Sequence, residues 1–266
     1  MIGTNGRVRI FEQNNLLVER SLFLENWPVD LSELSVPHIG LKLTVAECLL
    51  LAGAVYSSKD LEEKAAFSIM EKISVGLTKF PDGFFVRLGS RSPKDVLSLA
   101  GTYRSRSPES ALLALQRSQR IIEDCIWALN NNYLPTVFCR DWRTIEQWSE
   151  FRVFVRDRKI IGMCPYHAQL EPPRPDWLTT ESIFICLTEY VTKLMPLFPV
   201  SSVVCDVFLT ANSLNYSITP TLLELNPFCA KTDAILYSWE TASFDCAFRD
   251  YGGATFGGHE VDYKSL

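Results

Sequence analysis

Three oxygen-bearing side chains occur close together in the sequence and could bind a metal ion. Asp206 lies in the apolar run Val203–Phe208, and Glu224 and Asn226 lie two positions apart in a second apolar run that ends at Pro227. Side chains of a β-strand alternate between its two faces, so Glu224 and Asn226 point the same way. Carboxylate and amide oxygens without His or Cys are typical of Mg²⁺ sites, which water and substrate phosphates complete. The pattern predicts a site for Mg²⁺ and a nucleotide.

Each of these two segments also has a purely structural interpretation. An aspartate in an apolar strand can mark the end of that strand. Glu-x-Asn before Pro227 can form a solvated edge, because proline cannot donate to a ladder of hydrogen bonds. The occurrence of both segments in this order favours the metal site over these alternatives.

A nucleotide also needs positive charges for its phosphates, and the sequence offers several. Arg87 shares a strand face with Phe85 on a predicted strand at 83–88, so it would carry its charge inward if that face is buried. Exposure at the end of the strand is the structural alternative. Arg152 lies in a predicted strand at 150–156, on a face that could line a cleft between lobes. Further candidates for cofactor binding are Arg91, Lys94 and Arg140.

Composition limits the class of protein. The chain has 266 residues, of which 47% are hydrophobic, and its net charge is -5. These values are typical of a globular protein and argue against broad electrostatic capture of DNA or RNA. The eight cysteines form no C-x-x-C pair, so we expect free thiols. No apolar run is long enough to cross a membrane, and no long apolar stretch follows a basic start. We therefore expect a cytoplasmic protein without membrane contact.

The elements that would position these side chains are helices and a mainly antiparallel sheet. Apolar periodicity and capping residues such as Thr44 predict helices at 45–56, 61–73, 108–130 and 181–195. Alternating apolar runs predict strands at 83–88, 136–140, 150–156, 159–163, 202–209 and 218–226. This order lacks regular β-α-β alternation and therefore predicts an α+β protein with two lobes, 1–134 and 135–266.

The motifs between residues 84 and 240 resemble, in their order, those of the cell division cycle protein 123 family. The segments that carry the resemblance are Phe85–Asp95, Cys139–Trp142, Glu150–Arg156, Ile160–Gly162, Glu224–Phe228 and Thr232–Glu240. That family resembles the ATP-grasp enzymes in fold and binds ATP with Mg²⁺. Its eukaryotic members are cytosolic assembly factors for translation initiation factor 2. The resemblance implies a two-lobed ATP-grasp-like fold with a nucleotide cleft between the lobes, and a protein partner like that initiation factor.

The resemblance also implies roles for individual residues. Arg87 would contact phosphate, although the family usually has Lys there; the change preserves the charge and alters its geometry. Arg140 and Trp142 would lie beside the connection that holds adenine, and Arg152 would lie near the phosphates. The implied metal ligands are Asp206, Glu224 and Asn226.

Two departures from the family leave a catalytic alternative open. The family usually has Asp where this chain has Glu224, and Glu-x-Asn is the form seen in catalytic ATP-grasp ligases. After Ile160–Gly162 the family has a Gln-Arg-Asp run, where this chain has Cys-Pro-Tyr-His ending at His167. The alternative is a ligase that activates a carboxylate or a phosphorylated end, with RNA as one candidate acceptor and with Arg87 and Arg152 as the catalytic candidates. His167 could take part, but a lone His in a loop is more often structural.

Overall fold

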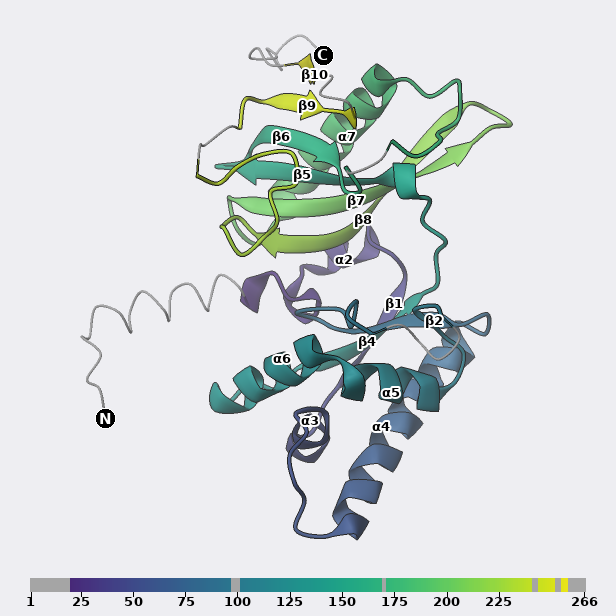
Figure 1. Ribbon diagram of the computed structural model, residues 1–266, viewed down its shortest axis with the longest axis vertical. Helices are drawn as coiled ribbons and strands as arrows, with labels where there is room; N and C mark the ends of the chain where they lie inside the picture. The colour runs from purple at the N-terminus through teal and green to yellow at the C-terminus, as the bar shows by residue number, and fades with distance from the viewer. Residues whose placement is uncertain (1–19, 97–100, 169–170, 241–243, 252–254, 258–266) are drawn as a thin grey trace, which may run out of the picture. The chain divides into compact units, whose positions relative to one another are not determined.

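The computed structural model describes residues 20–96, 101–168, 171–240, 244–251 and 255–257. Backbone contacts divide the chain into two compact units. We call Val36–Arg143 the four-stranded unit, and Met1–Ser35 together with Thr144–Leu266 the six-stranded unit. The elements, labelled in part in Figure 1, are η1 Leu24–Asn26, α2 Val29–Glu33, β1 His38–Lys42, α3 Val45–Leu51, α4 Lys59–Lys79, β2 Phe84–Leu88, β3 Arg104–Ser105, α5 Pro108–Arg117, α6 Gln119–Asn130, β4 Thr136–Asp141, η2 Gln147–Ser149, β5 Glu150–Arg156, β6 Lys159–Pro165, α7 Thr180–Leu194, η3 Met195–Leu197, β7 Val203–Asn212, β8 Ser217–Pro227, β9 Ala247–Arg249 and β10 Thr255–Gly257.

The four-stranded unit is an antiparallel sheet with helices on one face. Its strand order is β1-β4-β2-β3, and helices α3 to α6 lie on one side of it (Figure 1). On β2 the side chains of Phe84, Val86 and Leu88 join the buried apolar core against these helices. Because side chains alternate along a strand, Phe85 and Arg87 belong to the opposite face. The sheet therefore has an apolar face and a second face that carries charge.

The helical segment 108–130 is not the single helix that its periodicity predicts. It forms α5 and α6, with a break at Ser118, whose ψ of 116° is extended rather than helical. The Ser118 hydroxyl accepts a hydrogen bond from the Ile121 amide at 3.3 Å and donates one to Asp95 Oδ1 at 2.5 Å. The hydroxyl thus caps α6 and ties its first turn to the loop that follows β2.

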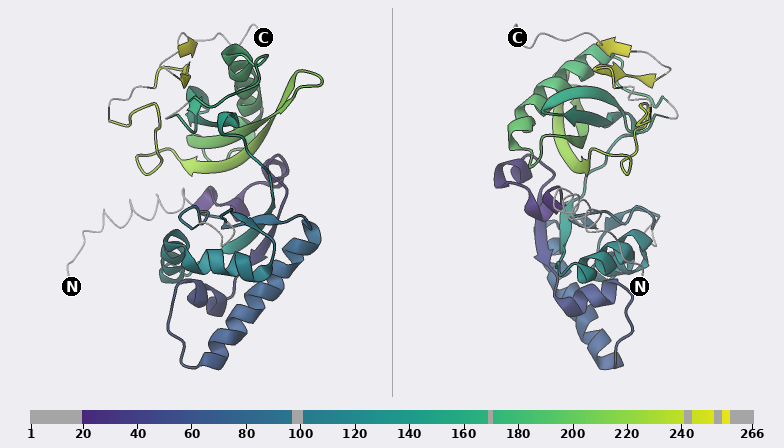
Figure 2. Two further views of the ribbon diagram at one scale, coloured as in Figure 1. Left: turned by 45° about the vertical axis from the view of Figure 1, so that its right-hand side comes forward. Right: turned by 90° about the vertical axis from the view of Figure 1, so that its left-hand side faces the viewer.

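The six-stranded unit is a sheet covered on both faces. Its order is β10-β9-β6-β5-β7-β8, and every pairing is antiparallel except that of β6 with β9. Helix α7 lies on one face, and the segment that follows β8 runs over the other (Figure 2). Phe154 and Val204 of the sheet pack there against aromatic side chains of that segment, including Tyr237 and Trp239. The covering segment is therefore held by an aromatic cluster.

Most predicted elements are present, with shifted ends. The α+β class and the antiparallel sheets are confirmed. Thr44 caps α3 through a complete capping box. The turn between β5 and β6 has positive φ at Asp157 and Arg158, 51° and 57°, as a two-residue type I′ hairpin requires. Thr179 caps α7, so this helix begins at Thr180, one residue before the predicted start at 181.

The compact units have bounds that differ from the predicted lobes, 1–134 and 135–266. Strand β4 pairs with β1 and with β2, which assigns it to the four-stranded unit. Residues just before 36 belong with the other unit, because Ser35 forms a bridge to Leu222 and the Leu34 carbonyl accepts a hydrogen bond from Tyr190. The functional division into those two lobes stays a prediction.

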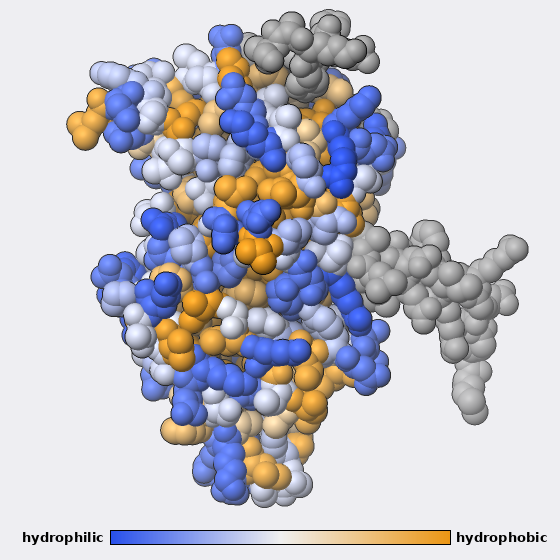
Figure 3. Space-filling model, turned by 180° about the vertical axis from the view of Figure 1, so that it is seen from behind, coloured by the Kyte–Doolittle hydropathy of each residue, from blue (hydrophilic) through white to orange (hydrophobic). Residues whose placement is uncertain are grey.

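The surface mixes polar and apolar side chains. Figure 3 shows apolar residues scattered among hydrophilic ones on one face of the protein. Val55, Phe67 and Leu214 are among the large apolar side chains that are exposed. Isolated exposed apolar residues are normal and assign no interface by themselves. None of the helices in the described parts of the chain has both the length and the apolar character that a membrane span needs.

Candidate functional site

The six-stranded unit brings together four of the predicted site residues. Arg152 on β5 lies opposite Asp206 on β7, and Asp206 lies opposite Glu224 on β8. Opposite residues of antiparallel strands project from the same face of the sheet. Asn226 follows two positions after Glu224, and its amide Nδ2 donates to Asp206 Oδ2 at 3.0 Å. The alternation predicted for β8 thus places Glu224 and Asn226 beside Asp206.

Arg152 and Asp206 form a buried ion pair. Arg152 Nε donates to Asp206 Oδ1 at 2.7 Å, and Nη2 donates to Oδ2 at 2.8 Å. The Arg152 side chain is 6% exposed and the Asp206 side chain 2%. Arg152 Nη1 also donates to the Asp233 carbonyl at 2.7 Å, in the segment after β8. The guanidinium therefore joins the sheet to the segment that covers it.

More negative than positive side chains lie around this ion pair. Burial raises the pKa of Asp206, and the negative charges of Glu224 and Glu150 raise it further, whereas the hydrogen bonds from Arg152 act against this. The pKa of Arg152 is raised, because its bonds and its attraction to Asp206 outweigh burial. Two further carboxylates, those of Glu224 and Glu150, thus act on the ion pair of Arg152 and Asp206. We identify a surplus of negative charge on this face, which favours the binding of a cation.

The donor set fits Mg²⁺ but forms no complete metal cage. In the part of the chain that the structure describes, no group of three or more His, Cys, Asp and Glu side chains is arranged to hold a metal ion. Mg²⁺ is usually bound by one or two carboxylates together with phosphates and water, rather than by an all-protein cage. Glu224, Asp206 and the amide oxygen of Asn226 supply hard oxygen donors of this kind. Asp206 would share its oxygens with Arg152.

The segment after β6 contributes two side chains to the same neighbourhood. The ring of Tyr166 lies 4.9 Å from the Arg152 guanidinium, measured to the ring centroid. His167 Nε2 lies 3.4 Å from Glu150 Oε2, and half of its side chain is exposed. The position of Glu150 can be predicted from the sequence, because it lies two residues before Arg152 on the same strand and so shares its face. Tyr166 has no comparable signal, because its loop position does not fix where its ring lies.

The four-stranded unit contains the predicted cationic residues Arg87 and Arg140. Both are buried, on the face of the sheet opposite the helices. Arg87 Nε donates to the Leu88 carbonyl at 2.8 Å, and Nη2 donates to the Ser90 carbonyl at 3.5 Å. Phe138 lies opposite Arg87, and Phe85 lies opposite Arg140. This face therefore combines guanidinium groups with aromatic rings, a chemistry that suits phosphates and a base.

Two other predicted residues of this unit have different surroundings. Trp142 directly follows β4, and the Arg104 guanidinium lies 6.0 Å from its ring centroid. Arg91 is bound to helix α6: its Nε lies 2.8 Å and its Nη2 2.5 Å from Asp124 Oδ1. The structure thus gives Arg91 a partner within its own unit, which the sequence does not indicate.

His38 on β1 also belongs to this neighbourhood, although no sequence pattern marks it as a site residue. It lies opposite Arg140, and its ring packs edge-on against Phe138. Burial lowers the pKa of His38, and the positive charges of Arg140 and Arg87 lower it further, although its hydrogen bond with the Val36 carbonyl opposes this. A neutral ring donates its Nδ1 proton to that carbonyl, 2.8 Å away. A single His on a five-residue strand gives no pattern by which the sequence could reveal it.

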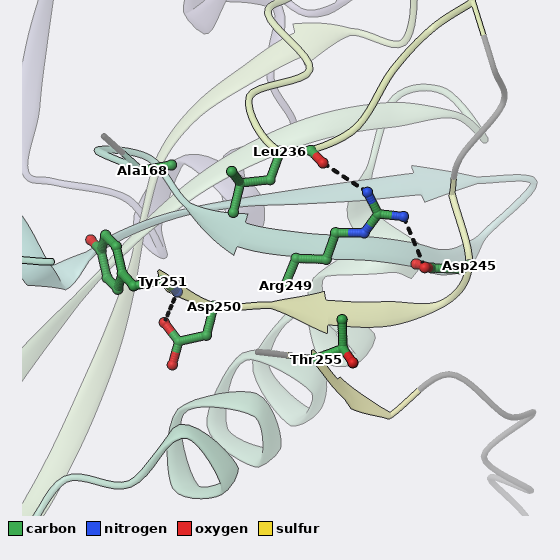
Figure 4. Close-up of a pocket in the computed structure, with 7 residues that line it drawn as sticks. All are labelled: Ala168, Leu236, Asp245, Arg249, Asp250, Tyr251 and Thr255. Carbon is green, nitrogen blue, oxygen red and sulfur yellow. Dashed lines mark hydrogen bonds and ion pairs between the residues drawn. The ribbon is translucent and has the colours of Figure 1, made fainter. Parts of the chain in front are cut away.

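Two pockets occur elsewhere in the described structure. One, of about 310 Å³, lies beside β9 and β10 in the six-stranded unit (Figure 4). In it Arg249 reaches the Leu236 carbonyl at 2.8 Å and Asp245 Oδ2 at 2.9 Å. The other, of about 470 Å³, lies between α3 and α4 and includes Glu47. The residues that line these two pockets include none of the predicted site residues.

Comparison with known proteins identifies relatives over most of the chain. The model of the D123 family matches residues 55–247. A translation initiation factor eIF2 assembly protein of Candida albicans is 25% identical over 193 residues, which cover 64% of this chain and 52% of that protein. A cell division cycle protein 123 of Candida glabrata is 32% identical over 167 residues, which cover 58% of this chain and 45% of that protein. The predicted resemblance is confirmed.

A solved structure has the same fold. The structure of Cdc123 from Schizosaccharomyces pombe matches with a TM-score of 0.64 and 20% sequence identity, over 84% of this chain and 90% of that chain. At this identity the likeness concerns the fold alone. The chain spans about half the length of the curated relatives it matches.

Proposed function

Because the chain belongs to the D123 family, we propose that it binds ATP with Mg²⁺ and acts as an assembly factor for translation initiation factor eIF2. Several relatives are named as translation initiation factor eIF2 assembly proteins. The match spans about half of those proteins. We therefore carry their activity and their partner over to this chain only as a proposal.

The observation that carries ATP binding is the presence of two further carboxylates, those of Glu150 and Glu224, beside the buried ion pair of Arg152 and Asp206. The carboxylates of Glu150, Asp206 and Glu224 exceed the guanidinium charge by two, which a divalent cation would neutralise. Glu224 and Asn226, together with Asp206, would hold Mg²⁺, and the bound ion would neutralise phosphate oxygens. Hard oxygen donors on one sheet face support this assignment.

The net charges of the two units support different binding roles for them. The four-stranded unit has fourteen lysines and arginines against eleven aspartates and glutamates, a net charge of +3. The six-stranded unit has twelve against twenty, a net charge of -8. Basic side chains attract phosphates and acidic ones attract metal ions. The four-stranded unit, with Arg87, Arg140 and Trp142, would supply the phosphate and adenine contacts, and the six-stranded unit the metal contacts.

Isothermal titration calorimetry with ATP, at fixed Mg²⁺ and without it, tests this proposal. Glu224→Gln and Asn226→Ala should each weaken Mg-ATP binding by roughly tenfold, because each removes one interaction of about 1.4 kcal/mol. Binding of ATP without Mg²⁺ should change less. Thr219→Ala, at an exposed position of the same strand, is the matched control and should leave both affinities unchanged. Equal Mg-ATP affinity in all four proteins would refute the metal site.

Product analysis and partner binding test the second half of the proposal. An assembly factor should retain purified eIF2 subunits on a column more strongly with Mg-ATP than without it, and should release no AMP. Release of AMP in the presence of RNA would instead favour the ligase alternative. Glu224→Gln provides the control, since it should need a higher concentration of Mg-ATP for the same retention.

A further inference from the structure

The loop between β2 and the undescribed residues 97–100 is fastened to helix α6 at two places. Near its start, Ser90 Oγ donates to Asp124 Oδ2 at 2.5 Å, and the Arg91 guanidinium bonds to Asp124 Oδ1. Near its end, Asp95 accepts hydrogen bonds from the Ser118 hydroxyl at 2.5 Å and from the Arg120 amide at 3.3 Å. Loop 89–96 is thus held at both ends by one helix.

Asp124 is the centre of the first attachment. Both of its carboxylate oxygens are engaged, one by Ser90 and the other by two nitrogens of Arg91. Arg91 Nη2 also donates to the Arg120 carbonyl at 3.0 Å and lies 3.3 Å from Glu123 Oε2. The pKa of Arg91 is raised, since these acidic partners outweigh the effect of burial. Three groups of α6 therefore hold the Arg91 guanidinium.

The same loop adjoins Arg87, the residue that the proposed function assigns to phosphate. Arg87 Nη2 donates to the Ser90 carbonyl, and the Leu88 amide donates to the Arg91 carbonyl at 2.9 Å. The backbone that Asp124 fixes at Ser90 and Arg91 is therefore the backbone that orients the Arg87 guanidinium. Fixed donors bind phosphate better than mobile ones, because less conformational freedom is lost on binding.

From this geometry we infer that Arg91 and Asp124 are positioning residues for phosphate binding and that Arg91 does not itself contact the nucleotide. The inference rests on the proposed function. Asp124 holds Arg91 and Ser90, these hold the loop, and the loop holds Arg87 toward the phosphates. This role replaces the direct contact that the sequence predicts for Arg91.

A double-mutant cycle in the full chain separates positioning from direct contact. If the two residues position the loop as a pair, Arg91→Ala, Asp124→Asn and the double variant should each weaken Mg-ATP binding by roughly tenfold, without additivity. If Arg91 contacts phosphate, Asp124→Asn releases it and leaves the affinity unchanged or higher. That outcome would overturn the inference.

Three further measurements exclude a general loss of structure. Adenosine affinity should stay within twofold of wild type in every variant, because only the phosphate contacts are altered. Arg91→Lys, which keeps the charge, should recover part of the affinity lost in Arg91→Ala. Asn130→Ala, at an exposed position at the end of the same helix, should behave as wild type. Equal losses for adenosine and ATP would overturn the inference.

Hydrogen exchange without nucleotide distinguishes failure of the inference from failure of the proposed function. The amides of loop 89–96 should exchange faster in Arg91→Ala and Asp124→Asn than in wild type. If the loop amides exchange faster in the two variants but the wild-type protein binds no ATP, the proposed function is refuted and the loop attachment stands. Unchanged exchange with intact ATP binding would refute the attachment alone.

Discussion

Replacing Arg152 with methionine should destabilise the six-stranded unit strongly at neutral pH and weakly in acid. Methionine keeps much of the apolar stem but removes the charge and the hydrogen bonds to Asp206 and to the Asp233 carbonyl. Asp206 then keeps the hydrogen bond from Asn226, on a face where Glu224 and Glu150 repel its charge. The substitution therefore leaves a buried carboxylate without its counter-ion.

The size of the effect follows from the burial of the pair. Breaking a buried ion pair by removal of one partner costs about 3–5 kcal/mol, because the remaining charge is uncompensated. A chain of this size loses about 2–4 °C in melting temperature for each kcal/mol, so the expected decrease is about 6–20 °C. The pKa of Asp206 is already raised by burial and would rise further in the variant. A carboxyl with a raised folded-state pKa favours folding below its unfolded pKa and loses that contribution as pH rises through the folded pKa.

Urea unfolding at pH 7 and at pH 4.5, followed by tryptophan fluorescence, measures both effects. The loss in Arg152→Met should be largest at pH 7 and smaller at pH 4.5, because the raised pKa of Asp206 makes its protonation easier as pH falls. Arg156→Met, at the exposed end of the same strand, is the matched control. A loss below about 1 kcal/mol, or an equal loss at the two pH values, would refute the reasoning, because a surface pair contributes only that much.

Three further substitutions test other parts of the fold. Burial raises the pKa of Glu47, but its hydrogen bonds, that of Lys72 above all, hold it below its ordinary value of 4.5. Glu47→Gln should therefore cost about 1–3 kcal/mol at pH 7, and urea unfolding should find the difference shrinking as pH falls below 4.5. Gly162→Ala would place a methyl group 2.7 Å from the Tyr237 ring, and calorimetry should find a loss of about 1–3 kcal/mol. Ser118→Ala removes the cap of α6 and should cost about 1–2 kcal/mol in urea unfolding. A loss of stability in Glu47→Gln that stays the same at all pH values would contradict the first expectation. A melting temperature within 1 °C of wild type for Gly162→Ala or Ser118→Ala would contradict the other two.

The strands and caps were predictable because their signals are local. Alternation along β8 places Glu224 and Asn226 on one face, and the structure has them beside Asp206. Thr44 followed by Glu47 three positions later is a complete capping box in the sequence and in the structure. Such patterns depend on a few neighbouring residues, so no tertiary contact is needed to recognise them.

The contacts that were not predicted depend on residues far apart in the chain. The pairing of Arg152 with Asp206 spans 54 positions and follows from the register of β5 on β7. The break at Ser118 is invisible in the periodicity of 108–130, because Asp95, 23 positions earlier, stabilises it. Arg91 is a cationic residue in the loop after a strand that carries Arg87, so the sequence predicts it to bind phosphate. Its ion pair with Asp124 depends on the packing of α6 against this loop, which the sequence does not show.

The hydroxyl of Tyr237 has a consequence for strand register. It accepts a hydrogen bond from the Met163 amide, and its single proton faces the Ala247 carbonyl at 2.6 Å and the Met163 carbonyl at 3.0 Å, so it bridges β6 and β9. The two strands pair directly at a single position, Met163 with Phe248. A strand of three residues specifies its own register weakly. The register of β9 on β6 is therefore set in part by a residue about ten positions before β9, because the Tyr237 hydroxyl must reach both strands at once.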